Sequence, residues 1–217
     1  MQALVRTAVL NGENTDAVLA ETEAMIRSGE VAAVPTDTVY GLVCDARNDG
    51  AVRRMFAIKK RPQEKAFPIF VKDIATARRY AYISDVKAKF LEKVWPGPVT
   101  VVFQHKEKLP PVLTGSKQTL GIRIPDHPFL LELLGCLDFP LAQTSANILD
   151  KPAAKTAAEA AQYFTDEKEQ PDLVIDGGQV KGTSSTAVDF TGNQPIILRA
   201  GPVTKSDLDV LLDRAEY

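Results

Sequence analysis

Short apolar runs alternate with amphipathic stretches along this chain of 217 residues, and that order restricts the possible folds more than any other property of the sequence. Apolar blocks and period-two runs predict strands, and apolar residues spaced three and four apart predict helices. We expect strands at 31–34, 38–44, 67–71, 99–103, 119–124, 141–144, 173–175, 186–190 and 196–198. We expect helices at 14–27, 51–60, 74–80, 85–94, 128–134, 156–162 and 206–214, with Asp49 as the cap of the second and Ser206 as the cap of the last. The last three strands follow one another without a helix, which favours an α/β fold with a mixed sheet flanked by helices over a wholly parallel sheet.

Composition and length indicate one soluble domain. The sequence is 45% hydrophobic and 25% charged, as in ordinary globular proteins. No apolar run approaches the ~20 residues that a membrane helix requires, and the first six residues lack the layout of a signal peptide. We therefore expect a single cytoplasmic domain over residues 1–217, with its core at about 14–205 and no membrane contact.

A dense group of basic residues lies in a chain whose net charge is -2. Between residues 52 and 65, six basic side chains accompany a single acid, Glu64; they are Arg53, Arg54, Lys59, Lys60, Arg61 and Lys65. Such a local excess of positive charge suits an anionic ligand. Because it follows the hydroxyl-rich segment 35–42, we interpret the two together as half of a nucleotide site. The alternative is an ordinary solvated helix end.

Three further groups carry cations or short polar side chains. Thr119, Gly121 and Arg123 share one face of a predicted strand, and a mid-strand arginine needs an anionic partner because burying its charge alone is costly. The segment 143–147 ends an apolar strand with short polar groups, and Arg199 ends another. Each signal is weak alone, and strand edges or turns are the simpler explanations. Together they predict one concave surface that binds a polyphosphate and a small polar co-substrate.

Several common kinds of site are absent from the sequence. There is no GxxxxGKS or GxxxxGKT loop, which excludes a P-loop, and no GxGxxG motif follows a strand. Cys44 and Cys136 lie far apart, and His105 and His127 could not form a metal site without carboxylates. We therefore predict no protein-bound metal site and no nucleophile of the Ser–His–Asp kind.

Seven short segments form a series that covers nearly the whole chain. They are PTDTVYGL (35–42), KKRP (59–62), WPGPVT (95–100), GIRIP (121–125), TSAN (144–147), STAVD (185–189) and LRAG (198–201). In this order they resemble the YrdC-type threonylcarbamoyl-adenylate synthases, far more specifically than any single motif would. The resemblance implies an α/β twisted mixed sheet with a large positively charged cavity, in the short form without an additional C-terminal domain.

The same resemblance implies an enzyme that makes threonylcarbamoyl-AMP and pyrophosphate from L-threonine, bicarbonate (or carbon dioxide) and ATP. Mg²⁺ would bridge the ATP phosphates, and the protein would act by positioning and by neutralising charge. Separate transfer proteins would use the product for the threonylcarbamoyladenosine modification of tRNA. Direct contact with tRNA is left open.

The resemblance also implies roles for single residues. Lys59 and Arg61 would hold the ATP phosphates and act as the catalytic cations. The rest of the nucleotide side would consist of Lys65, Thr119, Ser145, Asn147 and Arg199. Arg123 would clamp the threonine carboxylate through two hydrogen bonds, and the rest of the threonine side would consist of Thr36, Thr38, Gln143 and Ser185.

Three alternatives stay open at this point. A paralogous protein with this fold could lack the activity, although the intact segments 59–61 and 145–147 argue against that. A non-catalytic RNA-binding module would dock RNA on the basic cavity, but stacking of bases needs aromatic rings beside the cations, and helical spacing places Phe56 in the core. A related domain occurs in carbamoyl-transfer proteins that mature hydrogenases, which are much longer and carry zinc fingers.

Overall fold

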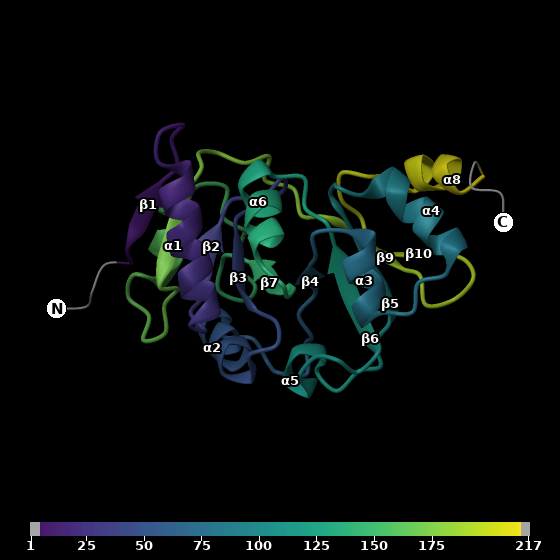
Figure 1. Cartoon of the computed structure of the whole chain (residues 1–217), viewed down its shortest axis with the longest axis horizontal. Coiled ribbons are helices and arrows are strands. Elements are labelled where there is room, and N and C mark those ends of the chain that lie inside the picture. The colour runs from purple at the N-terminus through teal and green to yellow at the C-terminus, as the bar shows by residue number, and fades with distance from the viewer. Residues whose placement is uncertain (1–4, 214–217) are drawn as a thin grey trace.

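The computed structural model describes residues 5–213, and within them ten strands form one sheet against which eight helices pack (Figure 1). The strands are β1 (Thr7–Val9), β2 (Ala32–Val34), β3 (Gly41–Asp45), β4 (Ile69–Phe70), β5 (Val99–Gln104), β6 (Thr119–Arg123), β7 (Leu141–Ser145), β8 (Leu173–Asp176), β9 (Thr186–Asp189) and β10 (Ile196–Arg199). The helices are α1 (Thr15–Arg27), α2 (Asp49–Lys59), α3 (Ile74–Tyr80), α4 (Asp85–Val94), α5 (Pro111–Thr114), α6 (Pro128–Cys136), α7 (Ala157–Phe164) and α8 (Lys205–Asp213). In this part of the chain, no helix has both the length and the apolar character needed to cross a membrane.

The sheet is mixed, as the order of the elements predicted. Its strands lie in the order β1-β8-β2-β3-β7-β4-β6-β5-β9-β10. Four neighbouring pairs are parallel and five are antiparallel. β1 and β10 therefore lie at opposite ends of the sheet, on the left and right of Figure 1. β7, from the second half of the chain, lies between β3 and β4 from the first half.

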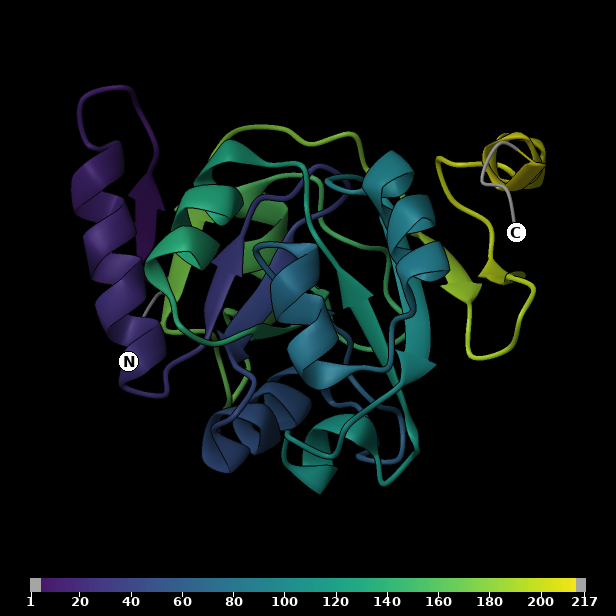
Figure 2. The same ribbon diagram turned by 45° about the vertical axis from the view of Figure 1, so that its right-hand side comes forward.

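Helices cover both faces of the sheet around β2. Ala32 and Val34 pack with α1 and α6 in one apolar cluster, whereas Ala33 points the other way and packs in a second cluster that includes residues of α2 and α7. α1 and α6 contact each other over the first face, and Figure 2 shows them side by side there. Both faces of β2 are therefore buried, which accounts for its wholly apolar sequence.

Around β5 and β6, α3 and α4 cover one face of the sheet. Val99, Val101 and Phe103 of β5 point into that core, where Phe103 and Phe90 of α4 both contact Phe190. The alternate residues of β5, Thr100 and Val102, line a cavity on the opposite face. The alternation of the strand thus separates a packed face from a face that is open to a ligand.

Some element boundaries differ from the predicted ones. The N-cap of α2 is Asn48 rather than Asp49, because Asn48 Oδ1 accepts from the Ala51 N–H at 3.1 Å. At α8, the capping side chain is Thr204 rather than Ser206, since Thr204 Oγ1 accepts from the Asp207 N–H at 3.2 Å. The predicted end of that helix, at residue 214, lies outside the described residues. The sequence does not predict β1 and α5, which are too short to show a hydrophobic period.

Candidate functional site

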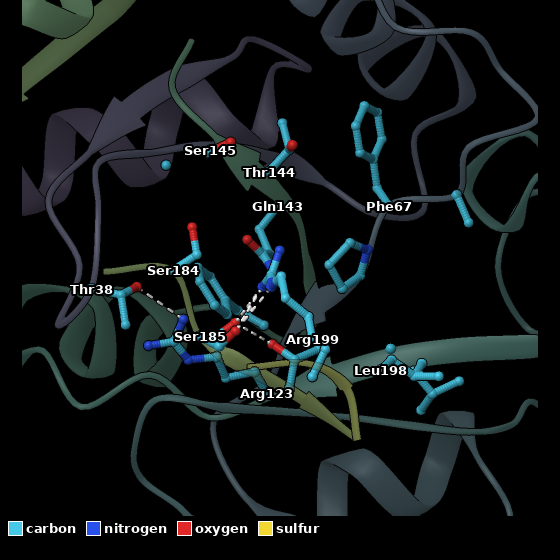
Figure 3. Close-up of a pocket in the computed structure, with 18 of the residues that line it drawn as sticks. Thr38, Phe67, Arg123, Gln143, Thr144, Ser145, Ser184, Ser185, Leu198 and Arg199 are labelled. Carbon is cyan, nitrogen blue, oxygen red and sulfur yellow. Dashed lines mark hydrogen bonds between the residues drawn. The ribbon is translucent and has the colours of Figure 1, made fainter. Parts of the chain in front are cut away.

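A cavity of about 440 Å³ lies on the open face of the sheet, over β5, β6 and β7 (Figure 3). This volume is in the range of small-molecule sites. The charged lining residues are Arg61, Lys117, Arg123 and Arg199; among the described residues that line it, none is a carboxylate. The uncharged polar lining residues are Thr36, Thr38, Thr100, Thr119, Gln143, Thr144, Ser145, Ser184 and Ser185. Such a lining favours an anionic, richly hydrogen-bonding ligand.

Gly121 makes room for this cavity. A Cβ at this position would lie 3.0 Å from Pro68 Cβ and 3.3 Å from Thr100 Cγ2, so a side chain would crowd the floor of the cavity. Thr119 and Arg123 flank Gly121 on the same face of β6, and all three line the cavity. The predicted alternation in this strand is therefore confirmed.

Arg123 is held at the base of the cavity by three protein oxygens. Its side chain is 3% exposed and that of its partner Asp37 is 6% exposed. Nε donates to Gly97 O at 2.9 Å, Nη1 to Thr38 Oγ1 at 3.1 Å and Nη2 to Asp37 Oδ1 at 2.5 Å. Burial lowers the pKa of Arg123, and the adjacent Asp37 carboxylate opposes that shift. A guanidinium has five N–H donors, so these contacts use three of them and leave two without a protein partner.

Thr36 and Thr38 line the cavity next to Arg123. Thr36 Oγ1 lies 2.9 Å from Thr38 Oγ1 and donates to Val39 O at 2.7 Å, while it accepts from the Thr38 N–H at 2.9 Å. This turn explains why β3 begins only at Gly41 and not at the predicted residue 38. Thr36 is therefore occupied in holding the turn, and Thr38 faces Arg123.

Ser185 and Arg199 contact each other where β9 and β10 meet the cavity. Arg199 donates to Ser185 O from Nε at 3.1 Å and from Nη2 at 2.8 Å, and Nη2 also reaches Ser185 Oγ at 3.1 Å (Figure 3). Ser185 Oγ lies 2.9 Å from Thr100 Oγ1, and burial lowers the pKa of Arg199. The resemblance assigns these two residues to different substrates, so the two substrate sides would meet here.

Of the basic residues at 52–65, only Arg61 is among the lining residues. Its Nε donates to Lys65 O at 2.9 Å and its Nη2 to Ala66 O at 3.1 Å, and burial lowers its pKa. Lys60 points away and forms an ion pair with Glu167 at 2.7 Å. The Lys65 side chain is exposed outside the cavity, so the structure does not bring it to the predicted nucleotide side.

Lys59 is buried beneath the cavity instead of lining it. Its Nζ lies near four oxygens: Ser145 O at 2.7 Å, Ser145 Oγ at 2.9 Å, Asn147 O at 3.1 Å and Asn147 Oδ1 at 2.5 Å. Burial, and then the charge of Arg61, lower the pKa of Lys59 to about 7, while the four oxygens favour the ammonium form. Lys59 therefore shapes the turn at Ser145, which lines the cavity, and Asn147 is held below it.

Gln143 is in the cavity as predicted, and four polar lining residues were not among the predicted ones. They are Thr100, Lys117, Thr144 and Ser184. Thr100 alternates with Val99 and Val101, so strand periodicity could have found it. Thr144 and Ser184 are direct neighbours of predicted residues. Lys117 lies in a short loop without any motif, and no sequence signal identifies it.

Residues 24–201 match the family model Sua5_yciO_yrdC, which is described as "Telomere recombination". The chain belongs to the Sua5/YciO/YrdC family. This match confirms the family that the seven segments indicated, and the observed mixed α/β sheet is the fold expected of it.

Relatives in this family include longer proteins. The chain is 35% identical to the threonylcarbamoyl-AMP synthase of Pyrococcus abyssi over 189 residues, which are 86% of this chain and 55% of that protein. The structure of P. abyssi Sua5 complexed with L-threonine matches with a TM-score of 0.87 at 30% identity, covering 96% of this chain and 61% of that chain. Escherichia coli YciO matches with a TM-score of 0.80 at 24% identity, covering 91% of this chain and 95% of that chain, which is a likeness of fold. The chain thus spans little more than half the length of the P. abyssi relative.

Proposed function

We propose that this protein is an L-threonylcarbamoyladenylate synthase, which uses ATP, L-threonine and bicarbonate. The observation that carries the proposal is the cavity, in which Arg61, Lys117, Arg123 and Arg199 surround hydroxyl groups without any lining carboxylate. Cations fixed by the fold can neutralise a polyphosphate and a carboxylate without reorganising. The P. abyssi relative and the L-threonine complex of P. abyssi Sua5 support this choice of substrates.

The proposed reaction has two steps. The amine of threonine adds to the carbon dioxide supplied by bicarbonate, losing a proton and giving a carbamate, with water released from bicarbonate. A carbamate oxygen then attacks the α-phosphorus of ATP, and the bond from that phosphorus to the bridging oxygen breaks as pyrophosphate leaves. The two free N–H groups of Arg123 would take the threonine carboxylate. Arg61 would neutralise the phosphates, Thr119 and Arg199 would contact the nucleotide, and Ser185 would contact the carbamate.

Mg²⁺ is proposed to enter bound to ATP. Among residues 5–213, no group of three or more His, Cys, Asp or Glu side chains could hold a metal ion. The cavity offers neutral hydroxyl oxygens, which fit an ion that keeps most of its ligands as phosphate and water oxygens. When bound, the ion would neutralise phosphate charge.

We further propose that the product passes to separate transfer proteins for tRNA modification in the cytoplasm. Direct docking of RNA in the cavity has less support. Phe67 is 1% exposed and stacks on Phe56 with ring centroids 4.0 Å apart, so it offers no free face to a base.

The test of the proposal is pyrophosphate release from ATP by the purified protein in bicarbonate, with and without L-threonine. We expect threonine-dependent release that falls by about 100-fold in Arg123→Ala, because the threonine carboxylate loses its partner. Arg53→Ala is the matched control, since Arg53 is an exposed arginine paired with Asp49 outside the cavity.

Because Arg123→Ala leaves the Asp37 charge buried alone, the double variant Arg123→Gln/Asp37→Asn is assayed as well, with circular dichroism to verify folding. Wild-type protein that is folded and binds ATP, yet releases no pyrophosphate in response to threonine, would refute the proposal.

A further inference from the structure

Lys117 is a cation of the cavity that the family resemblance does not assign. It lies in the loop between α5 and β6, and it is one of the four charged residues of the lining. Within the described part of the chain, its ammonium group has neither an ion pair nor a hydrogen bond, whereas Arg123 and Arg199 are both bonded to protein oxygens. Lys117 can therefore give all of its donors to a ligand.

The backbone of Lys117 is fixed although its side chain is free. His105 Nε2 lies 2.7 Å from Lys117 O, and His105 Nδ1 accepts from the Glu107 N–H at 3.0 Å. Since Nδ1 accepts, Nε2 carries the proton and donates to Lys117 O. The Lys117 N–H in turn donates to Thr114 O at 3.1 Å. These contacts hold the loop at the edge of the cavity.

The loop that carries Lys117 packs directly against the loop that carries Arg61. Gly115 has a φ of +58°, and a Cβ there would lie 2.7 Å from Glu64 O, so only glycine allows the two backbones to approach this closely. The Phe67 N–H donates to Leu113 O at 2.9 Å and joins the same two segments. Lys117 and Arg61 therefore enter the cavity from adjoining loops. Because both cations line the same cavity, an anion bound between them is attracted by both.

We propose that Lys117 is a further phosphate-binding residue, which forms with Arg61 the part of the cavity that takes the pyrophosphate portion of ATP. His105 is a positioning residue that acts through Lys117 by holding its backbone. This inference deepens the proposed function and rests on it for the identity of the ligand. The phosphate site itself can be tested without the synthase reaction.

The experiment measures binding of inorganic pyrophosphate, in the presence of Mg²⁺, by titration calorimetry. Lys117→Gln is expected to weaken binding by roughly tenfold or more, because a charge-assisted hydrogen bond to phosphate is lost. Lys108→Gln is the matched control, since it removes the same charge from an exposed lysine of the neighbouring loop outside the cavity. It should bind pyrophosphate as the wild type does, apart from a small effect that salt removes.

The role of His105 is tested by a double-mutant cycle. His105→Leu should weaken binding of pyrophosphate in the wild-type background and have no further effect in the Lys117→Gln background, because a residue that acts through another cannot add to its loss. His105→Gln should restore part of the affinity, since its amide N–H can reach the same carbonyl. An equal effect of His105→Leu in both backgrounds would overturn the positioning role.

Equal affinities of Lys117→Gln and Lys108→Gln, or no measurable binding of pyrophosphate by the wild type, would overturn the phosphate site. Failure of this inference can be told from failure of the proposed function. If the wild type releases pyrophosphate in response to threonine but Lys117→Gln binds pyrophosphate as the wild type does, the role of Lys117 is refuted and the proposed function stands. If Lys117→Gln binds pyrophosphate more weakly but the wild type shows no threonine-dependent reaction, the phosphate site stands and the synthase activity is refuted.

Discussion

Arg123 and Asp37 are 86 residues apart in the sequence, and they form an ion pair that is almost wholly buried. Removing two charges from water is expensive, and two further hydrogen bonds from Arg123 to protein oxygens offset part of that cost. Asp37 thereby fixes the direction of the guanidinium while leaving two of its donors free. Its own Oδ2 is buried and has no hydrogen-bond partner among the described residues.

Asp37→Asn should lower the free energy of unfolding by about 3 kcal/mol, because it keeps the shape of the side chain but leaves the Arg123 charge without a counter-charge. Urea unfolding monitored by circular dichroism measures the change. Asp85→Asn is the control, since Asp85 is 90% exposed in its ion pair with Arg78, and it should cost at most ~1 kcal/mol. Equal losses in the two variants would show that the buried ion pair contributes no more to the free energy of unfolding than the exposed pair does.

Lys59 gives a prediction about pH. Burial lowers its pKa to about 7 from the ordinary value of 10.5. Between these values the unfolded chain holds a proton that the folded chain lacks, so the free energy of unfolding should rise with pH, by up to ~1.4 kcal/mol per pH unit. Lys59→Met should lose this slope between about pH 7 and about pH 8.5. The difference between wild type and variant is the quantity to measure, since the raised pKa of the buried Cys44 thiol acts in the opposite direction in both proteins.

Lys60→Met is the control for the Lys59 variant, because Lys60 is exposed and faces Glu167. It should keep the wild-type slope. The same slope in Lys59→Met and in the wild type would mean that the four oxygens around Nζ hold the proton in the folded protein.

At the scale of elements, strand alternation decides which side chains face the cavity, and helix caps decide where the helices begin. β6 shows this most directly, because one face carries Thr119, Gly121 and Arg123 to the cavity while Leu120 and Ile122 enter the core. A shift of the strand by one residue would exchange the two faces and destroy the site. The pairing of β6 with β4 and β5 holds that register.

Asn48 sets the beginning of α2, the helix that leads to Lys59 and Arg61. Asn48→Ala should destabilise the protein by about 1 kcal/mol, since the cap on the Ala51 N–H is lost. Asp49→Ala should cost less, because Asp49 forms only an exposed ion pair with Arg53. Thermal unfolding of both variants checks the order. A larger loss for Asp49→Ala would support the cap that the sequence predicted and contradict the structure.

At the scale of the molecule, the cavity is assembled from segments spread between Thr36 and Arg199. Gly201, just after β10, packs against the backbone of residues 184–186, which include the cavity-lining Ser184 and Ser185. A Cβ there would lie 2.3 Å from the Thr186 nitrogen and 2.6 Å from Ser184 O. Beside it, Thr186 Oγ1 donates to Val203 O at 2.7 Å. The loop that follows the last strand is therefore docked on the segment that carries Ser185.

Gly201→Ala should lower the free energy of unfolding by about 2 kcal/mol, because backbone atoms that cannot move away meet the new methyl group. It should also weaken binding of threonine by displacing Ser185. Gly192→Ala is the matched control, since nothing lies within 4 Å of a Cβ at that position, and it should change stability by less than ~0.5 kcal/mol. Urea unfolding measures the stability and titration with threonine measures the affinity. Equal stability and equal affinity in the two variants would contradict the close packing inferred for Gly201.

Apart from β1 and α5, the sequence by itself determined the order of strands and helices, together with the mixed sheet, the two faces of β6 and the family, because hydrophobic period and motifs are local properties. It also identified Arg61, Arg123, Gln143 and Ser185, which the structure brings to one cavity. Only the tertiary structure decided which cations enter that cavity. Lys59 is turned under it, Lys65 is left outside, and Lys117 is brought in from a loop without a motif. The reason is that a lysine's surroundings depend on contacts with distant segments, such as those of Lys59 with Ser145 and Asn147, and local sequence rules contain no information about them.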